Sequence, residues 1–349
     1  MKLAIVSDAW APQVNGVVRT LTTTAERLTA RGHAVETVTP DQFRTIPCPT
    51  YPEIRLALGA RGKVAGRLGR FAPDAVHIAT EGPLGWAARR WCLGTGMPFT
   101  TSFHTRFPDY LAVRTRLPAD LFWPLLRRFH GPASATFAAT ASLREELKGR
   151  GLPNTHIWAR GVDLALFSPD NPPLPELAGL AGPIQLYVGR IAPEKNIEAF
   201  LASGAPGNKV VVGDGPARAE LARRFPETLF LGPLHGSRLA SAYASADVFV
   251  FPSRTDTFGL VMIEALASGV PVAAYPVPGP LDIIGPGGCG TTGGMARIGA
   301  LSHDLDAAIR AALTVDRAAC IAEGRRYDWE RCTDQFVAGL SLRGTRRAA

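Results

Sequence analysis

The sequence predicts an α/β protein in which two doubly wound parallel sheets form two domains that face each other across a cleft. The chain has 349 residues, and a typical domain has about 100–200. Hydrophobic residues make up 46% of the chain, enough for two buried cores. Short apolar runs alternate with amphipathic segments, which is the pattern of repeated βαβ units.

The expected strands form two series separated by residues 168–175, a proline-rich stretch with the composition of a linker. The first series is Leu3–Ser7, Ala34–Thr39, Ala75–Ala79, Phe99–Phe103, Thr136–Ala139 and His156–Ala159. The second series is Ile184–Gly189, Lys209–Gly213, Leu229–Gly232, Val248–Phe251 and Pro271–Tyr275. We therefore expect domains at residues 1–168 and 169–326. Ligands of such sheets bind outside the carboxyl ends of the strands.

Local signals mark two helix boundaries. The segment Val17–Ala30 ends just before Gly32, at the position after a helix that favours glycine. Asp304 and Asp306 follow Ser302 at the start of an amphipathic segment, where acids complement the helix dipole. The same two acids have the spacing of a metal-binding DxD motif, but the helix-start interpretation is favoured.

The formal net charge of +8 is unevenly distributed. Residues 1–168 carry a balance of +9, whereas residues 169–349 carry −1. The first half is therefore expected to meet negative charge. Nucleic acid is disfavoured because no RNP, zinc-finger or Lys/Arg-run pattern is present, which leaves an anionic membrane surface as the other candidate.

Membrane-spanning and secreted classes are disfavoured. No apolar run reaches the roughly 18 residues of a membrane helix, and Met1–Asp8 is too short and too soon charged for a signal peptide. The five cysteines have no CxxC spacing, so they indicate reduced cytosolic thiols rather than disulfides or a zinc site.

Residues 253–272 are the most informative stretch. Asp256 and Gly259 precede a nearly all-apolar helix that contains one acid, Glu264, and ends at Gly269. Such a helix is expected to be buried, and a buried carboxylate needs a partner. The helix start and Glu264 are separated by roughly 9 Å. That span fits a nucleotide-sugar, with sugar hydroxyls at Asp256, a diphosphate at the helix end and ribose at Glu264. Alternatively, Glu264 is a buried salt-bridge partner.

Two cations follow the expected strand at Ile184–Gly189. Arg190 comes directly after it, and Lys195 follows five residues later. Arginine offers a forked contact to phosphate and lysine a point charge. Together they can clamp a diphosphate, although plain surface charge is the alternative.

Other strand ends carry weaker signals. Gly16 lies in the turn after the first strand, where glycine lets backbone N–H groups approach a phosphate. The turn is not GxGxxG, which disfavours NAD, and a plain turn is the alternative. His104 ends another strand and is either structural or functional. Gly232 and Leu234 lie in a turn that either reads a base edge or needs no ligand.

Arginines and large apolar residues alternate between residues 107 and 129. The residues concerned are Arg114, Arg116, Phe122, Trp123, Arg127, Arg128 and Phe129. Such a segment can dock on anionic lipid with its aromatic rings inserted and its arginines on head groups. Ordinary helix packing is the alternative.

Taken together, these motifs resemble the retaining GT-B glycosyltransferases of family four. The resemblance covers essentially the whole chain, and its motifs are Pro12–Val17, Phe103–Thr105, Arg160–Asp163, Gly189–Asn196, Gly213–Pro216 and Asp256–Glu264. Ser253–Gly259 resembles the sulfoquinovosyl-, glucuronosyl- and mannosyl-transferases that glycosylate lipids or simple glycosides. The family's usual acidic pair is two glutamates, and Asp256 replaces the first with a carboxylate one methylene shorter.

The resemblance implies a role for each candidate residue. Asp256 and His104 contact the donor sugar, and Glu264 contacts the ribose. The remaining donor contacts that it implies are Arg190, Lys195, Gly16, Phe258, Gly259, Leu260, Gly232 and Leu234. It also implies that the last helix, within residues 327–349, returns to the first domain, and that no metal or cofactor is required.

We therefore expect a retaining enzyme that transfers a hexose or hexuronic acid from a nucleoside diphosphate sugar to a hydroxyl, with a membrane lipid such as diacylglycerol as acceptor. It is expected in the cytoplasm, peripheral on the inner face of the cytoplasmic membrane. One alternative is a GDP-mannose-dependent α-mannosyltransferase with a soluble or polysaccharide acceptor. Others are a nucleotide-sugar epimerase or hydrolase, and a non-catalytic sugar-nucleotide-binding protein or lipid-surface adaptor.

Overall fold

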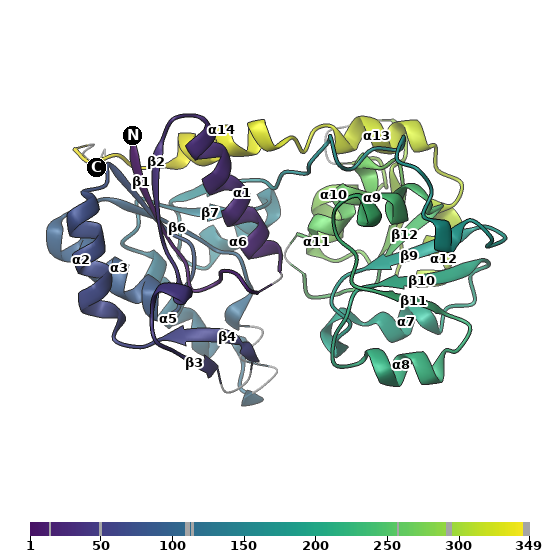
Figure 1. Cartoon of the computed structure of the whole chain (residues 1–349), viewed down its shortest axis with the longest axis horizontal. Coiled ribbons are helices and arrows are strands. Elements are labelled where there is room, and N and C mark those ends of the chain that lie inside the picture. The colour runs from purple at the N-terminus through teal and green to yellow at the C-terminus, as the bar shows by residue number, and fades with distance from the viewer. Residues whose placement is uncertain are drawn as a thin grey trace. The chain divides into compact units, whose positions relative to one another are not determined.

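The computed structural model describes residues 1–13, 15–48, 51–108, 112, 115–256, 258–290 and 295–344. The chain divides into two compact units (Figure 1), Met1–Ala159 with Glu330–Ala349, and Arg160–Trp329. Residues 160–168, expected in the first domain, belong to the second unit. There Val162 forms a parallel bridge with Asp328, and Phe167 packs edge-on against Tyr243.

The first unit contains a six-stranded parallel sheet of order β2-β1-β5-β6-β7-β8. Its strands are β1 (Lys2–Val6), β2 (Ala34–Val38), β5 (Ala75–Ile78), β6 (Phe99–Ser102), β7 (Ala135–Ala138) and β8 (Thr155–Ile157). Its helices are α1 (Gly16–Ala30), α2 (Ala60–Phe71), α3 (Pro83–Thr95), α5 (Trp123–His130), α6 (Ala141–Gly149) and α14 (Trp329–Gly339), with the short helices η1 (Pro40–Gln42) and η2 (Ala119–Phe122).

The second unit contains another six-stranded parallel sheet, of order β11-β10-β9-β12-β13-β14. Its strands are β9 (Ile184–Val188), β10 (Asn208–Val212), β11 (Leu229–Gly232), β12 (Val248–Phe251), β13 (Val272–Ala274) and β14 (Gly299–Leu301). Its helices are α7 (Ile197–Leu201), α8 (Arg218–Arg224), α9 (Gly236–Ala244), α10 (Leu260–Ala267), α11 (Pro278–Ile284), α12 (Leu305–Ala312) and α13 (Arg317–Gly324), with η3 (Pro175–Leu177) and η4 (Pro193–Lys195).

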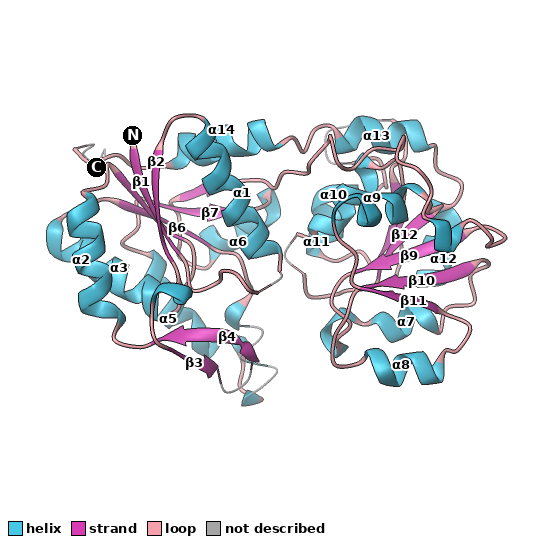
Figure 2. Ribbon diagram, viewed as in Figure 1, coloured by secondary structure: helices cyan, strands magenta, loops and turns pink. Residues whose placement is uncertain are grey.

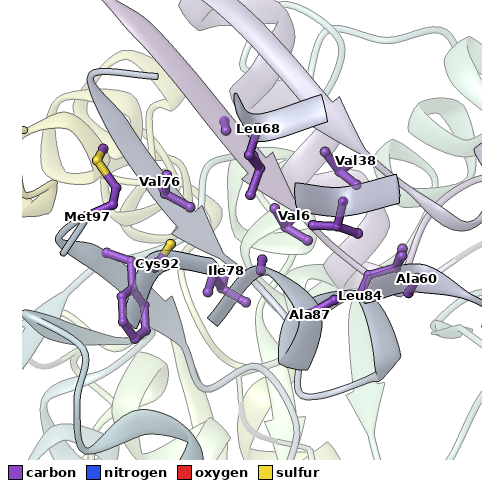
Figure 3. Close-up of a cluster of buried hydrophobic side chains, with 14 of the residues drawn as sticks. Val6, Val38, Ala60, Leu68, Val76, Ile78, Leu84, Ala87, Cys92 and Met97 are labelled. Carbon is purple, nitrogen blue, oxygen red and sulfur yellow. The ribbon is translucent and has the colours of Figure 1, made fainter. Parts of the chain in front are cut away.

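Each sheet lies between helices (Figure 2), which explains why its central strands β1, β9 and β12 consist mostly of buried apolar residues. In the first unit, Val6, Val38 and Ile78 of the sheet are packed with buried side chains of α2 and α3 (Figure 3). The segment α14 is tied to the same unit by ion pairs between Arg27 and Glu330 and between Arg31 and Asp334. The strand order confirms the predicted doubly wound fold.

Both sheets reverse their strand order at one position. In the first unit the chain passes to β2 on one side of β1 and to β5 on the other; in the second, β9 is flanked by β10 and β12. A crevice forms at the carboxyl ends of the strands where the order reverses, and it is the usual ligand site in such sheets. These two switch points are therefore the places to look for a site.

Local predictions and the structure agree at both helix boundaries. Gly32, at φ 79°, follows the C-cap of α1. The Asp304 side chain caps α12 by accepting from the N–H groups of Asp306 and Ala307, which confirms the helix-start interpretation. The sequence analysis missed β14 and an antiparallel hairpin formed by β3 (Thr45–Cys48) and β4 (Tyr51–Ala57). Within the described residues, no helix is long and apolar enough to cross a membrane.

Candidate active site

Two predicted site residues form an ion pair at the switch point of the second sheet. The Nζ atom of Lys195, in η4 after β9, lies 2.5 Å from Oδ1 of Asp256, in the loop after β12. The two loops are joined twice more. The Asn196 side chain donates to the carbonyl of Pro252 at 3.1 Å, and the Thr255 hydroxyl donates to the carbonyl of Glu194 at 3.5 Å. The carboxyl ends of β9 and β12 are therefore held together by side chains.

Arg190 lies at the same edge, directly after β9. Its guanidinium is 3.7 Å from the carboxylate of Glu194, and its carbonyl accepts a hydrogen bond from the Tyr187 hydroxyl at 2.9 Å. Both expected phosphate-binding cations thus follow one strand, each near a carboxylate.

The N-terminus of α10 follows Asp256 in the chain. Its N-cap is Gly259, at φ 92°, and no described side chain caps the helix or supplies an acid in its first turn. A β-carbon at Gly259 would lie 2.7 Å from Met262 and 2.9 Å from Phe251, so a larger residue cannot take its place. Phe258 is buried beside it, and Leu260 begins the helix. A helix start of this kind, with no cap from the described side chains, is the local arrangement that the predicted anion site requires.

Glu264 is only 3% exposed, as expected for the acid in an apolar helix. Its Oε2 atom accepts a hydrogen bond of 2.9 Å from the hydroxyl of Tyr243, on α9. Tyr243 is itself packed against Phe167 and Phe249. The sequence analysis missed this partner, because nothing in the local pattern of α9 points to a residue 21 positions later in the chain.

Gly232 and Leu234 lie at a different part of the same edge. Gly232 ends β11 at φ 73°, and its carbonyl accepts from the N–H of Gly213. Leu234 is half-buried in the following turn. Because β11 is two strands away from β9, this turn is roughly 10 Å from the Arg190 loop in the plane of the sheet. That separation leaves room for a ligand that spans several strand ends.

The predicted residues of the first unit are engaged within that unit. Gly16 is the first residue of α1, and the Asn15 side chain accepts from the N–H groups of Val17 and Val18 at 3.0 Å each. The N-terminus of α1 therefore has a side-chain cap. His104 follows β6, is buried, and packs edge-on against Trp158 at 5.7 Å between ring centroids.

A buried acid at the first switch point escaped the sequence analysis. Asp8, just after β1, accepts from the N–H groups of Leu84 and Gly85 at the start of α3 and from the Thr80 hydroxyl. A β-carbon at Gly82 would lie 2.3 Å from its carboxyl carbon. Burial raises the pKa of Asp8 to about 6, and the hydrogen bonds oppose that shift. The available signal was an acid directly after an apolar strand.

A second missed residue is Arg254, between β12 and Asp256. Its guanidinium lies over the ring of Tyr275, 3.9 Å from the centroid. It is exposed, and none of the described acids lies within ion-pair distance of it. The loop therefore presents a third cation near the carboxyl ends of β12 and β13.

The structure corrects the expected membrane segment. Trp123 and Phe129 are 4% and 1% exposed, because Trp123 stacks on Phe103 and Phe129 packs against Trp86. These rings belong to the core and are not available for insertion; Phe122 is half-buried. The exposed large apolar side chains and arginines among the described residues of this region are Phe107, Leu117, Leu121, Leu125, Arg116, Arg127 and Arg128. Arg114 lies outside the described residues.

Two doubly wound units, one with cations beside a helix start that no described side chain caps, have the architecture of the GT-B fold class. Sucrose-phosphate synthase from Thermosynechococcus elongatus has the same fold, with a TM-score of 0.71, 23% identity and coverage of 97% of each chain. HepE of Anabaena, solved with UDP, has a TM-score of 0.68 and 17% identity over 97% of this chain and 99% of its own. No group of three or more metal-ligating side chains occurs among the described residues.

Sequence comparison identifies the family. A model described as Glycosyltransferase Family 4 matches residues 14–166, and one described as Glycosyl transferases group 1 matches residues 182–314. A GDP-mannose-dependent alpha-mannosyltransferase of Mycobacterium tuberculosis is 34% identical over 88% of this chain and 87% of its own length. The chain belongs to the family 4 glycosyltransferases and is an enzyme of that class.

Two other relatives indicate the range of the family. Sulfoquinovosyl transferase SQD2 of Arabidopsis thaliana is 30% identical over 82% of this chain, which spans 61% of the relative's length. Alpha-monoglucosyldiacylglycerol synthase of Streptococcus pneumoniae is 28% identical over 80% of this chain and 72% of its own. The predicted resemblance to this group of transferases is thereby confirmed.

Proposed function

We propose that the protein is a retaining glycosyltransferase that transfers a hexose or hexuronic acid from a nucleoside diphosphate sugar to a hydroxyl of a membrane lipid. The observation that carries the proposal is the Lys195–Asp256 pair at the switch point of the second sheet. It brings a cation for the leaving phosphate and an acid for the sugar into direct contact, in the loop that leads into α10.

The leaving group is proposed to drive the chemistry. When the glycosidic bond of the donor breaks, negative charge develops on the diphosphate. We assign the stabilisation of that charge to Arg190, Lys195 and the first N–H groups of α10, including those of Gly259 and Leu260. No metal or cofactor is needed in this scheme, because the two cations supply the positive charge. The leaving phosphate then assists the acceptor hydroxyl on the same face of the sugar, which retains the anomeric configuration.

The remaining residues are proposed to hold the donor. Asp256 keeps one oxygen on Lys195 and accepts sugar hydroxyls with the other. Glu264, oriented by Tyr243, accepts the ribose hydroxyls. Gly232 and Leu234 line the nucleotide, and the N–H groups of Phe258 and Gly259 bind the diphosphate.

A lipid acceptor is supported by the surface of the first unit and by the diacylglycerol product in the name of one relative. Exposed Leu117, Leu121 and Leu125 occur in the same short region as three exposed arginines. Near an anionic leaflet each arginine contributes about 1 kcal/mol. We propose reversible, salt-sensitive docking on the inner face of the cytoplasmic membrane, with these leucines rather than the buried rings of Trp123 and Phe129 in the lipid.

A second candidate is a GDP-mannose-dependent α-mannosyltransferase with a soluble or polysaccharide acceptor. The specific observation in its favour is the 34% identity to the mycobacterial mannosyltransferase over most of both chains.

One experiment separates these functions. Purified protein is incubated with UDP- and GDP-sugars, each with diacylglycerol in anionic vesicles or with a soluble glycoside, and products are identified by mass spectrometry. Glycolipid formation with an anomerically retained linkage supports the proposal, and Lys195→Ala should abolish it. Mannosylation of the soluble glycoside alone would establish the second candidate. Donor loss without any glycoside product indicates a hydrolase or epimerase and would contradict both.

A further inference from the structure

Helix α2 lines an open basic pocket. None of the residues assigned to the proposed reaction lines this pocket. The pocket has a volume of about 250 Å³, and it is lined by residues 42–43 at the end of η1 and by one face of α2. The α2 side contributes Lys63, Arg67 and Arg70, together with Gly62 and Gly66. Their three- and four-residue spacing places the cations on the same face of the helix.

Two of the three cations of the pocket have no acidic partner among the described residues. Arg67 is bound to Glu36 of β2 through two hydrogen bonds, of 2.6 and 3.0 Å. Lys63 and Arg70 are exposed, and no described acid lies within ion-pair distance of either. None of the described residues that line the pocket is acidic. Two positive charges therefore face the same cavity without a counter-ion.

The glycines of α2 have no structural reason to be there. Glycine destabilises a helix interior relative to alanine, yet neither Gly62 nor Gly66 has the positive φ that would require it. A β-carbon at Gly62 would meet nothing within 4 Å, and one at Gly66 would meet only the Arg70 guanidinium, at 3.5 Å. The opposite face of α2 does pack: Ala60 and Leu68 lie among the core side chains (Figure 3).

Residues that destabilise the element in which they occur are expected where a function requires them. Here, repelling cations and two of the three glycines of α2 line one cavity and keep it open and positive, whereas the third glycine, Gly69, lies outside it. The glycines allow a ligand to lie against the helix backbone. The cations favour a ligand that carries negative charge. A plain solvent-exposed face would be better served by alanines and by acids paired with the cations.

We propose that this pocket binds a phosphate ester. A phosphate monoester carries about −1.5 to −2 charges at pH 7, which matches Lys63 and Arg70, while Arg67 keeps its two hydrogen bonds to Glu36. Pockets for larger ligands have volumes of about 300–1,000 Å³, and the volume of this pocket is smaller. An ester the size of a lipid headgroup therefore fits, whereas a nucleotide-sugar does not. A soluble ester and the headgroup of an anionic phospholipid share this chemistry.

The test uses the full chain and two probes. Glycerol 3-phosphate binding is measured by calorimetry at low salt, and co-sedimentation is measured with phosphatidylcholine vesicles with and without phosphatidic acid. Lys63→Ala with Arg70→Ala should weaken binding at least tenfold. Arg61→Ala is the matched control, because Arg61 is an exposed cation of the same helix that does not line the pocket. UDP binding, measured in parallel, should be unchanged in each variant.

Glycine variants test the shape of the pocket without changing its charge. Gly62→Ala with Gly66→Ala fills the pocket floor, while Gly69→Ala adds a methyl group to the same helix outside the pocket. Each should raise the Tm of the first unit by roughly 2–4 °C per substitution, but only the Gly62/Gly66 variant should lose phosphate binding, by several-fold.

The outcomes separate the possible sources of the phosphate. Binding of glycerol 3-phosphate that depends on Lys63 and Arg70 supports a soluble ester. Binding only to phosphatidic acid vesicles, with the same dependence, supports a lipid headgroup. If the wild-type protein binds neither probe, or the Lys63/Arg70 and Arg61 variants bind equally well, the proposal is wrong, and the proposed glycosyl transfer is unaffected by that result.

Discussion

The carboxyl edges of the two sheets contain similar residues but use them differently. At the first switch point, Asp8 accepts from two N–H groups of α3, and Asn15 caps α1. At the second, no described side chain caps α10, and the partly exposed Lys195–Asp256 pair lies in the loops that meet there. Within the part of the chain that the structure describes, one edge thus has capped helix starts, whereas the other has a helix start without a side-chain cap beside accessible charges.

The difference between the two edges indicates which of them is suited to bind an anion. N–H groups at a helix start need an acceptor, and a side-chain cap is the usual solution. Where the chain supplies the cap, polar residues serve stability. Where it leaves the donors open beside cations, a ligand is the remaining acceptor. The same architecture therefore distinguishes a structural edge from a binding edge.

The largest expected effect tests the binding edge. Lys195→Ala should lower turnover by roughly 100- to 1,000-fold at saturating donor, because loss of a preorganised charge at a leaving group typically costs about 2.7–4 kcal/mol. Arg223→Ala, an exposed cation on α8 of the same unit, is the matched control. Steady-state kinetics measure both, and near-wild-type turnover of the Lys195 variant would contradict the phosphate assignment.

The next effect tests the structural edge through pH. Because the pKa of Asp8 is raised from 3.8 to about 6, the native carboxyl keeps its proton between those values while the unfolded one has lost it. The free energy of unfolding should therefore fall as pH rises from about 4 to about 6, by about 3 kcal/mol from this group.

Asp8→Asn should remove that fall. Thermal melts at pH 4 and pH 7 measure it, with Asp41→Asn, an exposed acid of the same unit, as control. The variant should gain stability relative to wild type as pH rises. If the difference between them is the same at both pH values, Asp8 does not carry the pH dependence. Donor binding should not change, in contrast to variants of the second edge.

Substitution of Glu264 tests whether the binding edge extends to the buried carboxylate in α10. Glu264→Ala should weaken donor binding by roughly 10- to 150-fold, since a hydrogen bond to a charged group contributes about 1.5–3 kcal/mol. Tyr243→Phe removes only the hydroxyl that orients Glu264 and should have a smaller effect. Calorimetry with the nucleoside diphosphate measures both. Unchanged affinity in the Glu264 variant would remove its ribose role and leave a structural pair with Tyr243.

The smallest effect is expected at Asn15. Asn15→Ala should destabilise the first unit by about 1 kcal/mol through loss of the α1 cap, and Asn15→Gly by a few tenths. Denaturant unfolding distinguishes them. If Asn15→Ala leaves stability unchanged and tightens anion binding at α1, the first edge is a binding edge as well, and the comparison fails.

Local sequence patterns were sufficient to predict features that depend on residues within one short segment. The expected strand Val248–Phe251 has the observed bounds, and Asp304 caps its helix as predicted. The burial of α10 and Glu264 followed from composition alone. Even the α5 error was avoidable, because the buried residues Trp123, Leu126 and Phe129 follow helical spacing and mark the inward face.

By itself, the sequence determined the doubly wound class, the order of most elements and the candidate cations, because apolar periodicity, glycines and helix-cap residues act over a few neighbouring positions. Only the tertiary structure decided that Lys195 pairs with Asp256, that Tyr243 binds Glu264 and that Asp8 caps α3. These contacts join residues 61, 21 and 76 positions apart. Such partners are chosen by strand order and helix packing, which no local pattern records.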